Sequence, residues 1–222
     1  MFKRIRIVGR GRVGAAVAAR LRDRGADLET DRPELVLLCV PDAAIHAAAA
    51  DVAVGPWIAH VSGATPLAAL SPHALRFGLH PLQTFTKRRG AEQLDGAWAA
   101  VTAEDGDARL RGHWLAGQLG LRAFDLPERS RVLYHAGGTI AANYLVTLFR
   151  AASRLLEIAG APPEALVPLM RRTIENGFEL TGPLARGDWT TVAAHREAIA
   201  GSRPELDHLY ETLAGATLAL AT

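Results

Sequence analysis

Three glycines near the start of the chain have the spacing of a dinucleotide-binding turn. Gly9, Gly11 and Gly14 form the pattern Gly-x-Gly-x-x-Gly, which follows a short β-branched run and opens an apolar helical repeat. In such a turn the first glycine permits a tight bend, the second admits a pyrophosphate, and the third lets helix and strand pack closely. The helix N-terminus adds positive potential toward the anion. The cofactor contacts expected here are Gly9, Gly11, Arg12, Val13 and Gly14.

Two further turns follow predicted strands. Val40 and Pro41 end the apolar run of residues 35–40, and Ser62 and Gly63 follow the strand predicted at residues 57–61. Ligands of open α/β sheets bind outside the carboxyl ends of the strands, so we expect these four residues to contact the cofactor. Ser62 has no Gly-x-Ser-x-Gly elbow around it, which favours a turn residue over a nucleophile.

Three polar side chains are candidates for the chemical step. His80 lies in a Leu-His-Pro-Leu-Gln-Thr-Phe segment and is placed to donate a proton to a substrate oxygen. A structural histidine, hydrogen-bonded across its loop, is an equal alternative. His135 and Asn143, eight residues apart, share a face of a long predicted helix with Thr139 between them. A buried hydrogen-bonded stripe between helices is the alternative for that pair.

Substrate recognition is expected from two loops. Gln83 follows His80, and residues 181–188 interrupt a helical region with two glycines and a proline. Within that second loop Arg186 can bind a carboxylate or phosphate through two N–H groups, and Thr181 is a further candidate contact. The lone cysteine, Cys39, lies in an apolar run and offers no disulfide or paired metal ligands, so no metal site is expected.

The elements that position these residues alternate through the first part of the chain. Strands are predicted near residues 5–8, 35–40, 57–61, 76–79, 97–102 and 122–126, with helices after Gly11, after Asp42 as N-cap, and over 107–119. This alternation predicts an α/β, mostly parallel doubly wound sheet over residues 1–127. Residues 128–222 are predicted to be all-helical, with one helix capped by Asp188. His46 and His73 are expected at the surface without a role.

The second βα unit of the sheet is predicted to be abbreviated. Only 25 residues lie between Gly14 and Val40, which is too few for a full second strand, helix and third strand. Glu29 or Asp31 is the candidate for the acid that normally holds the adenosine ribose. The shortening counts against an ordinary adenosine pocket.

Composition excludes several classes of protein. The chain has 222 residues, 49% hydrophobic and 22% charged, which is typical of a globular protein of one large or two modest domains. Its net charge is +2, and its arginines are scattered, without the basic stripe of a nucleic-acid binder. No apolar run approaches the roughly 18 residues of a membrane span, and no secretion signal is evident. We therefore expect a cytoplasmic protein without nucleic-acid or membrane partners.

Taken in order, these motifs resemble a known bacterial family. GxGRVG at residues 9–14, GLHPLQTF at 78–85 and TGPLARGD at 181–188 are similar to proteins that pair a short Rossmann-like domain with a C-terminal helical domain of unknown function 2520. That family resembles the β-hydroxyacid dehydrogenase, ketopantoate reductase and pyrroline-5-carboxylate reductase group. The resemblance implies an NAD(P)-dependent oxidoreductase with a helical domain that dimerises. In the wider group a proton-donating lysine often precedes an asparagine by four residues; Asn143 matches the asparagine, but Thr139 replaces the lysine.

The resulting hypothesis is hydride transfer between NADP, or less strongly NAD, and a small carbonyl or imine compound that carries a carboxylate. His80 or His135 exchanges the proton, Asn143 orients the reacting oxygen or nitrogen, and Arg186 fixes the carboxylate. One alternative is a catalytically degenerate Rossmann-like ligand-binding or regulatory protein, favoured by the missing lysine and the short adenosine region. Another is an enzyme that uses a different adenosine-containing ligand, such as a nucleotide or S-adenosylmethionine.

Overall fold

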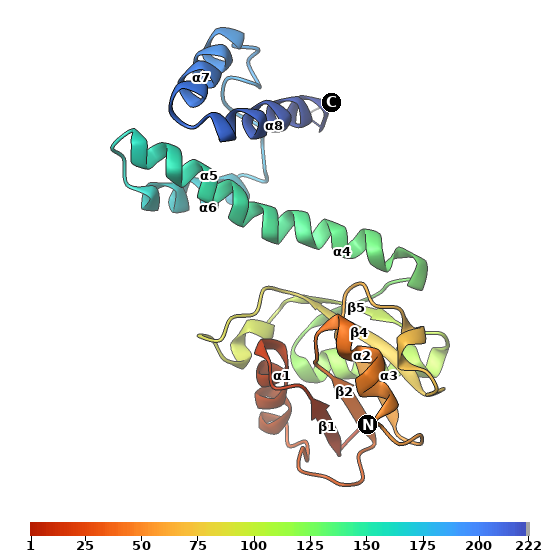
Figure 1. Ribbon diagram of the computed structural model, residues 1–222. Helices are drawn as coiled ribbons and strands as arrows, with labels where there is room; N and C mark the ends of the chain where they lie inside the picture. Colours follow the sequence, from red (N-terminus) through yellow and green to blue (C-terminus); the bar gives the residue numbers. More distant parts are fainter. Residues whose placement is uncertain (221–222) are drawn as a thin grey trace. The chain divides into compact units, whose positions relative to one another are not determined.

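The computed structural model describes residues 1–220, which form two compact units. The first unit is Met1–Ala142, and the second begins at Asn143. In Figure 1 the colours from red to green follow the sheet and helices of the first unit, and the helices from α5 on belong to the second. The α/β fold class with helices at the C-terminal end is confirmed. The domain boundary after residue 127, between a dinucleotide-binding domain and a helical domain, stays a prediction.

Within residues 1–220, six strands form one sheet in the order β1-β2-β3-β4-β5-β6. The strands are β1 (Ile5–Val8), β2 (Leu35–Leu38), β3 (Trp57–His60), β4 (Arg76–Leu82), β5 (Trp98–Thr102) and β6 (Arg122–Asp125). Neighbouring strands are parallel except β4 and β5, which are antiparallel. The mostly parallel Rossmann-like sheet is therefore as predicted, and each predicted strand is present.

Helices cover both faces of this sheet and explain the apolar run in β2. Helices α1 (Arg12–Asp23) and α3 (Gly106–Leu119) pack on the face that carries Leu35 and Leu37. Helix α2 (Ile45–Ala50) packs on the opposite face with Val36 and Leu38. Because successive strand residues point to opposite faces and both faces are buried, every position of β2 is apolar.

The second βα unit is abbreviated, as the sequence predicts. Its strand is a single parallel bridge between Arg4 and Asp27. Two backbone hydrogen bonds hold that bridge, from Ile5 N to Asp27 O at 2.9 Å and from Asp27 N to Lys3 O at 2.8 Å. The chain then returns and enters β2 on the other side of β1. One bridge thus replaces the strand on which an adenosine pocket is usually built.

Two predictions around α2 are wrong. Asp42 does not cap a helix: it is the first residue of a 3₁₀ turn, and its carboxylate instead accepts a hydrogen bond from the Ser62 hydroxyl at 2.8 Å. The Asp42 carboxylate thus binds a side chain 20 residues away instead of a backbone N–H at the start of the helix. His73 is buried rather than at the surface, and its Nε2 lies within hydrogen-bond distance of Ala49 O, at 3.0 Å.

The helices that follow the sheet keep the predicted spacing with one interruption. They are α4 (Arg131–Thr139), α5 (Leu145–Ile158), α6 (Leu166–Glu175), α7 (Trp189–Ser202) and α8 (Asp207–Leu220). A π-helical turn, Ile140–Tyr144, separates α4 from α5. Asp188 caps α7 by accepting from Thr191 N at 3.1 Å, as predicted. Among the described residues no helix has the length and apolarity that crossing a membrane requires.

Candidate functional site

The three glycines of the first turn have distinct spatial roles. Gly9 adopts φ +105°, and a Cβ atom added there would lie 2.4 Å from Cys39 O. A Cβ on Gly14 would lie 2.1 Å from Gly9 O. A Cβ on Gly11, by contrast, would meet no atom within 4 Å. Gly9 and Gly14 are thus required for packing, whereas open space lies in front of Gly11 at the start of α1.

The residues predicted beside that turn lie around it. Arg12 begins α1, and its Nη1 lies 3.5 Å from Phe85 O in the loop after β4. Val13 packs against the apolar core under α1, and Val40 packs against the core on the other face of the sheet. Pro41 is exposed directly before the 3₁₀ turn. The turn is therefore supported from β2 and from the loop after β4.

A cleft of about 730 Å³ lies beside the glycine turn, where the adenosine half of a dinucleotide is expected. Glu29 and Asp31, the two acids proposed from the sequence, both line it. The remaining polar lining residues are Arg6, Arg10, Arg22 and Thr30. The shortened segment after Asp27 therefore forms one wall of a cleft instead of a second full strand.

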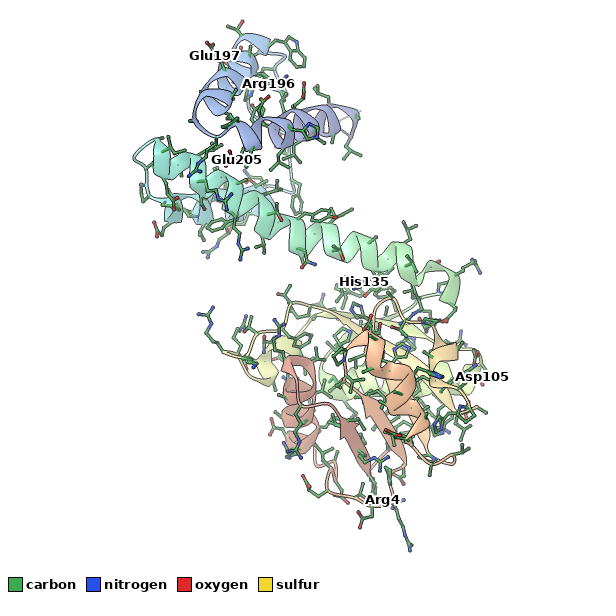
Figure 2. The ribbon with its side chains drawn as sticks, in the orientation of Figure 1. Arg4, Asp105, His135, Arg196, Glu197 and Glu205 are labelled. Atoms are coloured by element: carbon green, nitrogen blue, oxygen red, sulfur yellow. The ribbon has the colours of Figure 1, made fainter. Side chains whose placement is uncertain are left out.

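Two histidines and a glycine form the centre of a second group, which we call the histidine cluster (Gly63, His80 and His135). The rings of His80 and His135 are 5.8 Å apart between centroids. A Cβ on Gly63 would lie 3.0 Å from Nε2 of His80 and 2.5 Å from Cδ2 of His135. Figure 2 labels His135, which projects from α4. The structure thus brings together three residues that the sequence places 17 and 55 positions apart along the chain.

Tyr134 completes the surroundings of His80. Its hydroxyl oxygen lies 2.8 Å from Nδ1 of His80, and the two rings meet edge to face. Burial, with smaller contributions from His135 and Arg131, lowers the pKa of His80 to about 4. Burial raises the pKa of Tyr134 to about 12. At neutral pH both side chains are therefore uncharged.

Arg131 ties the turn at Ser62 to the sheet. Its side chain is 1% exposed, and it donates from Nη1 to Thr102 Oγ1 at 2.8 Å and from Nη2 to the Ser62 carbonyl. A Cβ on Gly78 would lie 2.9 Å from Arg131 Nη1, so glycine is needed there to admit the guanidinium. Burial lowers the pKa of Arg131, but a guanidinium stays charged at any working pH. A buried cation therefore lies beneath the histidine cluster.

The Ser62 side chain is fully engaged in shaping its turn. Its hydroxyl donates to Asp42 Oδ2 at 2.8 Å and accepts from the backbone N–H of Thr65 at 2.9 Å and of Ala64 at 3.2 Å. The structure shows no histidine hydrogen-bonded to this hydroxyl among the described residues. These bonds match a turn residue rather than an activated nucleophile.

His60, at the end of β3, lies next to this group and is fully buried. Neither of its ring nitrogens has a hydrogen-bond partner among residues 1–220. Burial, and then the charge of Arg131, lowers the pKa of His60 to about 4. Such a ring stays neutral because charging it without a partner would cost several kcal/mol.

The other predicted site residues lie apart from the histidine cluster or in the second unit. Gln83 donates to Gln93 O at 3.1 Å and accepts from Thr84 N at 2.8 Å, so it holds the loop after β4. Asn143, Thr181 and Arg186 belong to the second unit and are exposed.

Sequence reasoning missed Arg131 and Tyr134. Both lie on α4 with His135, at positions i, i+3 and i+4, which share one face of a helix. That spacing is the signal that points to them. Asp42 was missed for another reason, because its partner Ser62 lies 20 residues away.

Comparisons with known proteins agree with this architecture. The model of the family described as domain of unknown function (DUF2520) matches residues 97–217. A protein from Bacteroides fragilis, assigned as an NADP oxidoreductase, superposes with a TM-score of 0.82 at 19% identity, covering 98% of each chain. No curated protein sequence matches the chain.

Two further solved structures are similar over nearly the whole chain. A reductive aminase from Aspergillus terreus, in complex with NADPH and ethyl levulinate, has a TM-score of 0.67 at 17% identity, covering 96% of this chain and 93% of its own. The 1-pyrroline-5-carboxylate reductase of Streptococcus pyogenes has a TM-score of 0.62 at 14% identity, covering 97% and 98%. At these identities the likeness establishes the fold.

Proposed function

The chain belongs to the DUF2520 family, and we propose that it is an NAD(P)-dependent oxidoreductase. The proposed reaction moves a hydride to or from a small carbonyl or imine compound that carries a carboxylate. One observation carries the proposal: the glycine turn after β1 and the histidine cluster at the ends of β3 and β4 lie at the same edge of the sheet. The carboxyl edge of such a sheet is where ligands bind. Similar folds solved as a reductive aminase and a pyrroline-5-carboxylate reductase support the substrate class.

The residues of the glycine turn fit a dinucleotide. The open space at Gly11, at the start of a 12-residue helix, suits a pyrophosphate, and Gly9 and Gly14 hold that backbone in place. The cleft beside Glu29 and Asp31 suits the adenosine half. A bound nicotinamide would supply or accept the hydride.

The chain's own residues would then place the substrate and handle its proton. His80 and His135 lie side by side and would hydrogen-bond the reacting oxygen or nitrogen or exchange its proton. Arg131 would keep the Ser62–Gly63 turn in place through the Ser62 carbonyl. Asn143 and Arg186 belong to the second unit, and their roles toward the substrate stay predictions from the sequence.

NADP is the favoured dinucleotide. Arg6, Arg10 and Arg22 all line the adenosine cleft, and guanidinium groups bind phosphate through paired N–H groups. The ion pair between Arg22 and Glu29, at 3.9 Å, is exposed and weak enough to open for a phosphate. Titration calorimetry should give a lower Kd for NADPH than for NADH. Arg10→Gln should make the two Kd values more similar.

The cofactor half of the proposal is tested by thermal stabilisation with NADPH, NADH, S-adenosylmethionine and ATP. A ligand at 100 times its dissociation constant adds about 2.7 kcal/mol to stability. Gly11→Val is the matched variant. A Cβ at this position would meet no atom within 4 Å, the backbone φ of −71° suits any residue, and the side chain would enter the space proposed for the pyrophosphate. It should keep the wild-type melting temperature and lose the shift. An unchanged melting temperature of the wild-type protein with both NADPH and NADH would contradict the proposal.

The catalytic half is tested by following NADPH consumption with 2-oxoacids and cyclic imines. Turnover of one of these compounds, abolished in Gly11→Val, is the expected result.

A second candidate function is a ligand-binding or regulatory protein that has lost catalysis, favoured by Thr139 in place of the lysine and by the single-bridge second strand. Dinucleotide binding without turnover of any compound would favour this second candidate.

We also propose a homodimer formed through the helical unit. Large apolar side chains are exposed there, among them Phe178 at 71% and Leu169 at 62%. Exposed apolar surface on this scale is typical of an interface. Light scattering after gel filtration should give twice the 23.7 kDa chain mass, and Leu169→Glu should return the protein to the monomer.

A further inference from the structure

The hydroxyl of Tyr134 is within hydrogen-bond distance of a single described group, Nδ1 of His80, at 2.8 Å. Either the tyrosine O–H donates to Nδ1, or Nδ1–H donates to the tyrosine oxygen. The edge-to-face packing of the two rings, 87° between planes, fixes their relative orientation. The direction of this bond decides which nitrogen of a neutral His80 carries the proton.

Two observations favour the tyrosine as donor. In the opposite arrangement the phenol proton would need a second acceptor, and none is found among residues 1–220. Burial also raises the pKa of Tyr134 to about 12, so the phenol keeps its proton. Donation to Nδ1 satisfies the tyrosine and leaves the His80 proton on Nε2.

The other ring nitrogen of His80 faces the centre of the histidine cluster. A Cβ on Gly63 would lie 3.0 Å from Nε2 and from Cε1 of His80, so only a glycine allows the ring this position. Nε2 has no protein partner among the described residues, and it is not among the fully enclosed polar atoms. A donor N–H with no internal acceptor is therefore available to a ligand.

The charges around His80 favour its neutral form. The titratable groups near it are His135, Arg131 and Tyr134 from α4, Asp42 from the turn after β2, and His60 from β3. Burial, then the neighbouring His135 and the guanidinium of Arg131, outweigh the opposite effect of Asp42, so the pKa of His80 falls to about 4. A neutral imidazole is a hydrogen-bond donor at Nε2 but a poor proton source.

We propose that Tyr134 is a positioning residue that holds the proton of His80 on Nε2, so that His80 acts as a neutral hydrogen-bond donor to the reacting oxygen or nitrogen. This inference rests on the proposed function and narrows it. His80 polarises the carbonyl or imine, and the proton that completes a reduction comes from another group. His135, in contact with His80, is the candidate for that transfer.

The protonation pattern of His80 is the direct test. In the full-length ¹⁵N-labelled protein at neutral pH, long-range ¹H–¹⁵N NMR distinguishes protonated from unprotonated ring nitrogens, and His80 is identified by its absence in His80→Gln. We expect the proton on Nε2 in the wild type and a mixed pattern in Tyr134→Phe. Tyr210→Phe, which removes the hydroxyl of a second histidine–tyrosine pair, should leave His80 unchanged. A wild-type His80 protonated on Nδ1 would overturn the proposal.

Turnover provides an independent readout. Tyr134→Phe should lower kcat about tenfold, the effect of one hydrogen bond, with KM within about twofold of the wild type. His80→Gln, whose amide N–H reaches the place of Nε2, should be more active than His80→Asn, whose amide takes the place of Nδ1. Equal activity of these two variants would contradict the donor role. Because NMR needs no substrate, failure of the proposed function would appear separately, as no turnover in the wild type.

If Tyr134→Phe does not fold, the wild-type NMR pattern and the Gln/Asn pair at His80 still decide the proposal. Circular dichroism and the melting temperature establish folding before the kinetics are compared.

Discussion

The chain contains two histidine–tyrosine pairs of nearly the same local geometry, one in each unit. In the first, His80 Nδ1 and the Tyr134 hydroxyl are 2.8 Å apart, with rings at 87°. In the second, His195 Nδ1 and the Tyr210 hydroxyl are 2.9 Å apart, with rings at 89°. Judged by the hydrogen bond alone, the two pairs are equivalent.

Their surroundings differ. The first pair lies between β4 and α4, half-buried, with the buried cation Arg131 and a second histidine beside it. The second joins α7 to α8, its histidine is exposed, and it borders an apolar hollow of about 390 Å³. Burial and nearby charge change the chemistry of an imidazole, whereas an exposed pair mainly links two helices. The environment, more than the hydrogen bond, therefore makes the first pair a candidate for catalysis.

Removing the histidine of each pair should give the largest difference in turnover between the two pairs. His80→Ala should lower turnover of the best 2-oxoacid or imine substrate by about 100-fold or more, because a positioned donor is lost. His195→Ala should leave turnover within about twofold of the wild type. NADPH consumption at saturating substrate measures both. Equal losses in the two variants would mean that the environment of the first pair is not special.

Acid should lower the stability of the first unit through His60, the buried histidine beside Arg131. Its pKa is about 4 in the folded protein, below the ordinary 6.5, so between these values the unfolded chain binds more protons. The contribution of His60 to the free energy of unfolding should therefore fall by about 2 to 3 kcal/mol as the pH drops from 6.5 to 4. Urea unfolding followed by tryptophan fluorescence measures this slope, and His60→Leu should reduce it. An unchanged slope in that variant would show that His60 is not the source.

A methyl group at Gly63 probes the crowding around the first pair. Its Cβ would lie 2.5 Å from His135 and 3.0 Å from His80, so one or both rings must move. Gly63→Ala should lower turnover about tenfold, since displaced groups of this kind cost on the order of 1.4 kcal/mol. Steady-state kinetics and the His80 NMR signals should change together. Full activity would mean that the ring positions do not matter.

A glycine-to-alanine substitution in the second unit has the smallest expected effect. It should stabilise the protein, whereas Gly63→Ala should impair turnover. Gly201 lies in α7, and a Cβ there would meet nothing within 4 Å. Gly201→Ala should stabilise the protein by about 0.5 to 1 kcal/mol, because alanine restricts the unfolded chain and favours the helix. Urea unfolding tests this, with turnover unchanged. Destabilisation would show that α7 is packed more closely than these distances indicate.

Local patterns in the sequence predict most of the fold. The β-branched and apolar runs give all six strands, Asp188 caps its helix, and the short segment after Gly14 indicates the abbreviated βα unit. The π-helical turn at Ile140–Tyr144 could not be predicted, since residues 140–159 keep ordinary helical spacing. Periodicity describes which face is apolar and does not detect one extra residue in a turn.

The candidate site is predicted in part, for a physical reason. The glycine turn and the two histidines are visible as motifs, but the burial of Arg131 depends on Thr102, 29 residues away, and on Ser62, 69 residues away. An arginine in a sequence is expected at the surface. Only the tertiary contacts that satisfy it, together with the space at Gly78, make its burial possible.

Gly9 and Gly14 pack against Cys39 at the end of β2. The reactivity of this thiol therefore reports how often the glycine turn opens. Cys39 is the only cysteine, it is buried, and burial raises the pKa of its thiol to about 12. Because only a thiolate reacts rapidly with a disulfide reagent, labelling requires local opening. The labelling rate of the unmodified protein thus measures how often this segment opens, and a ligand that closes the turn would slow it without any engineered probe.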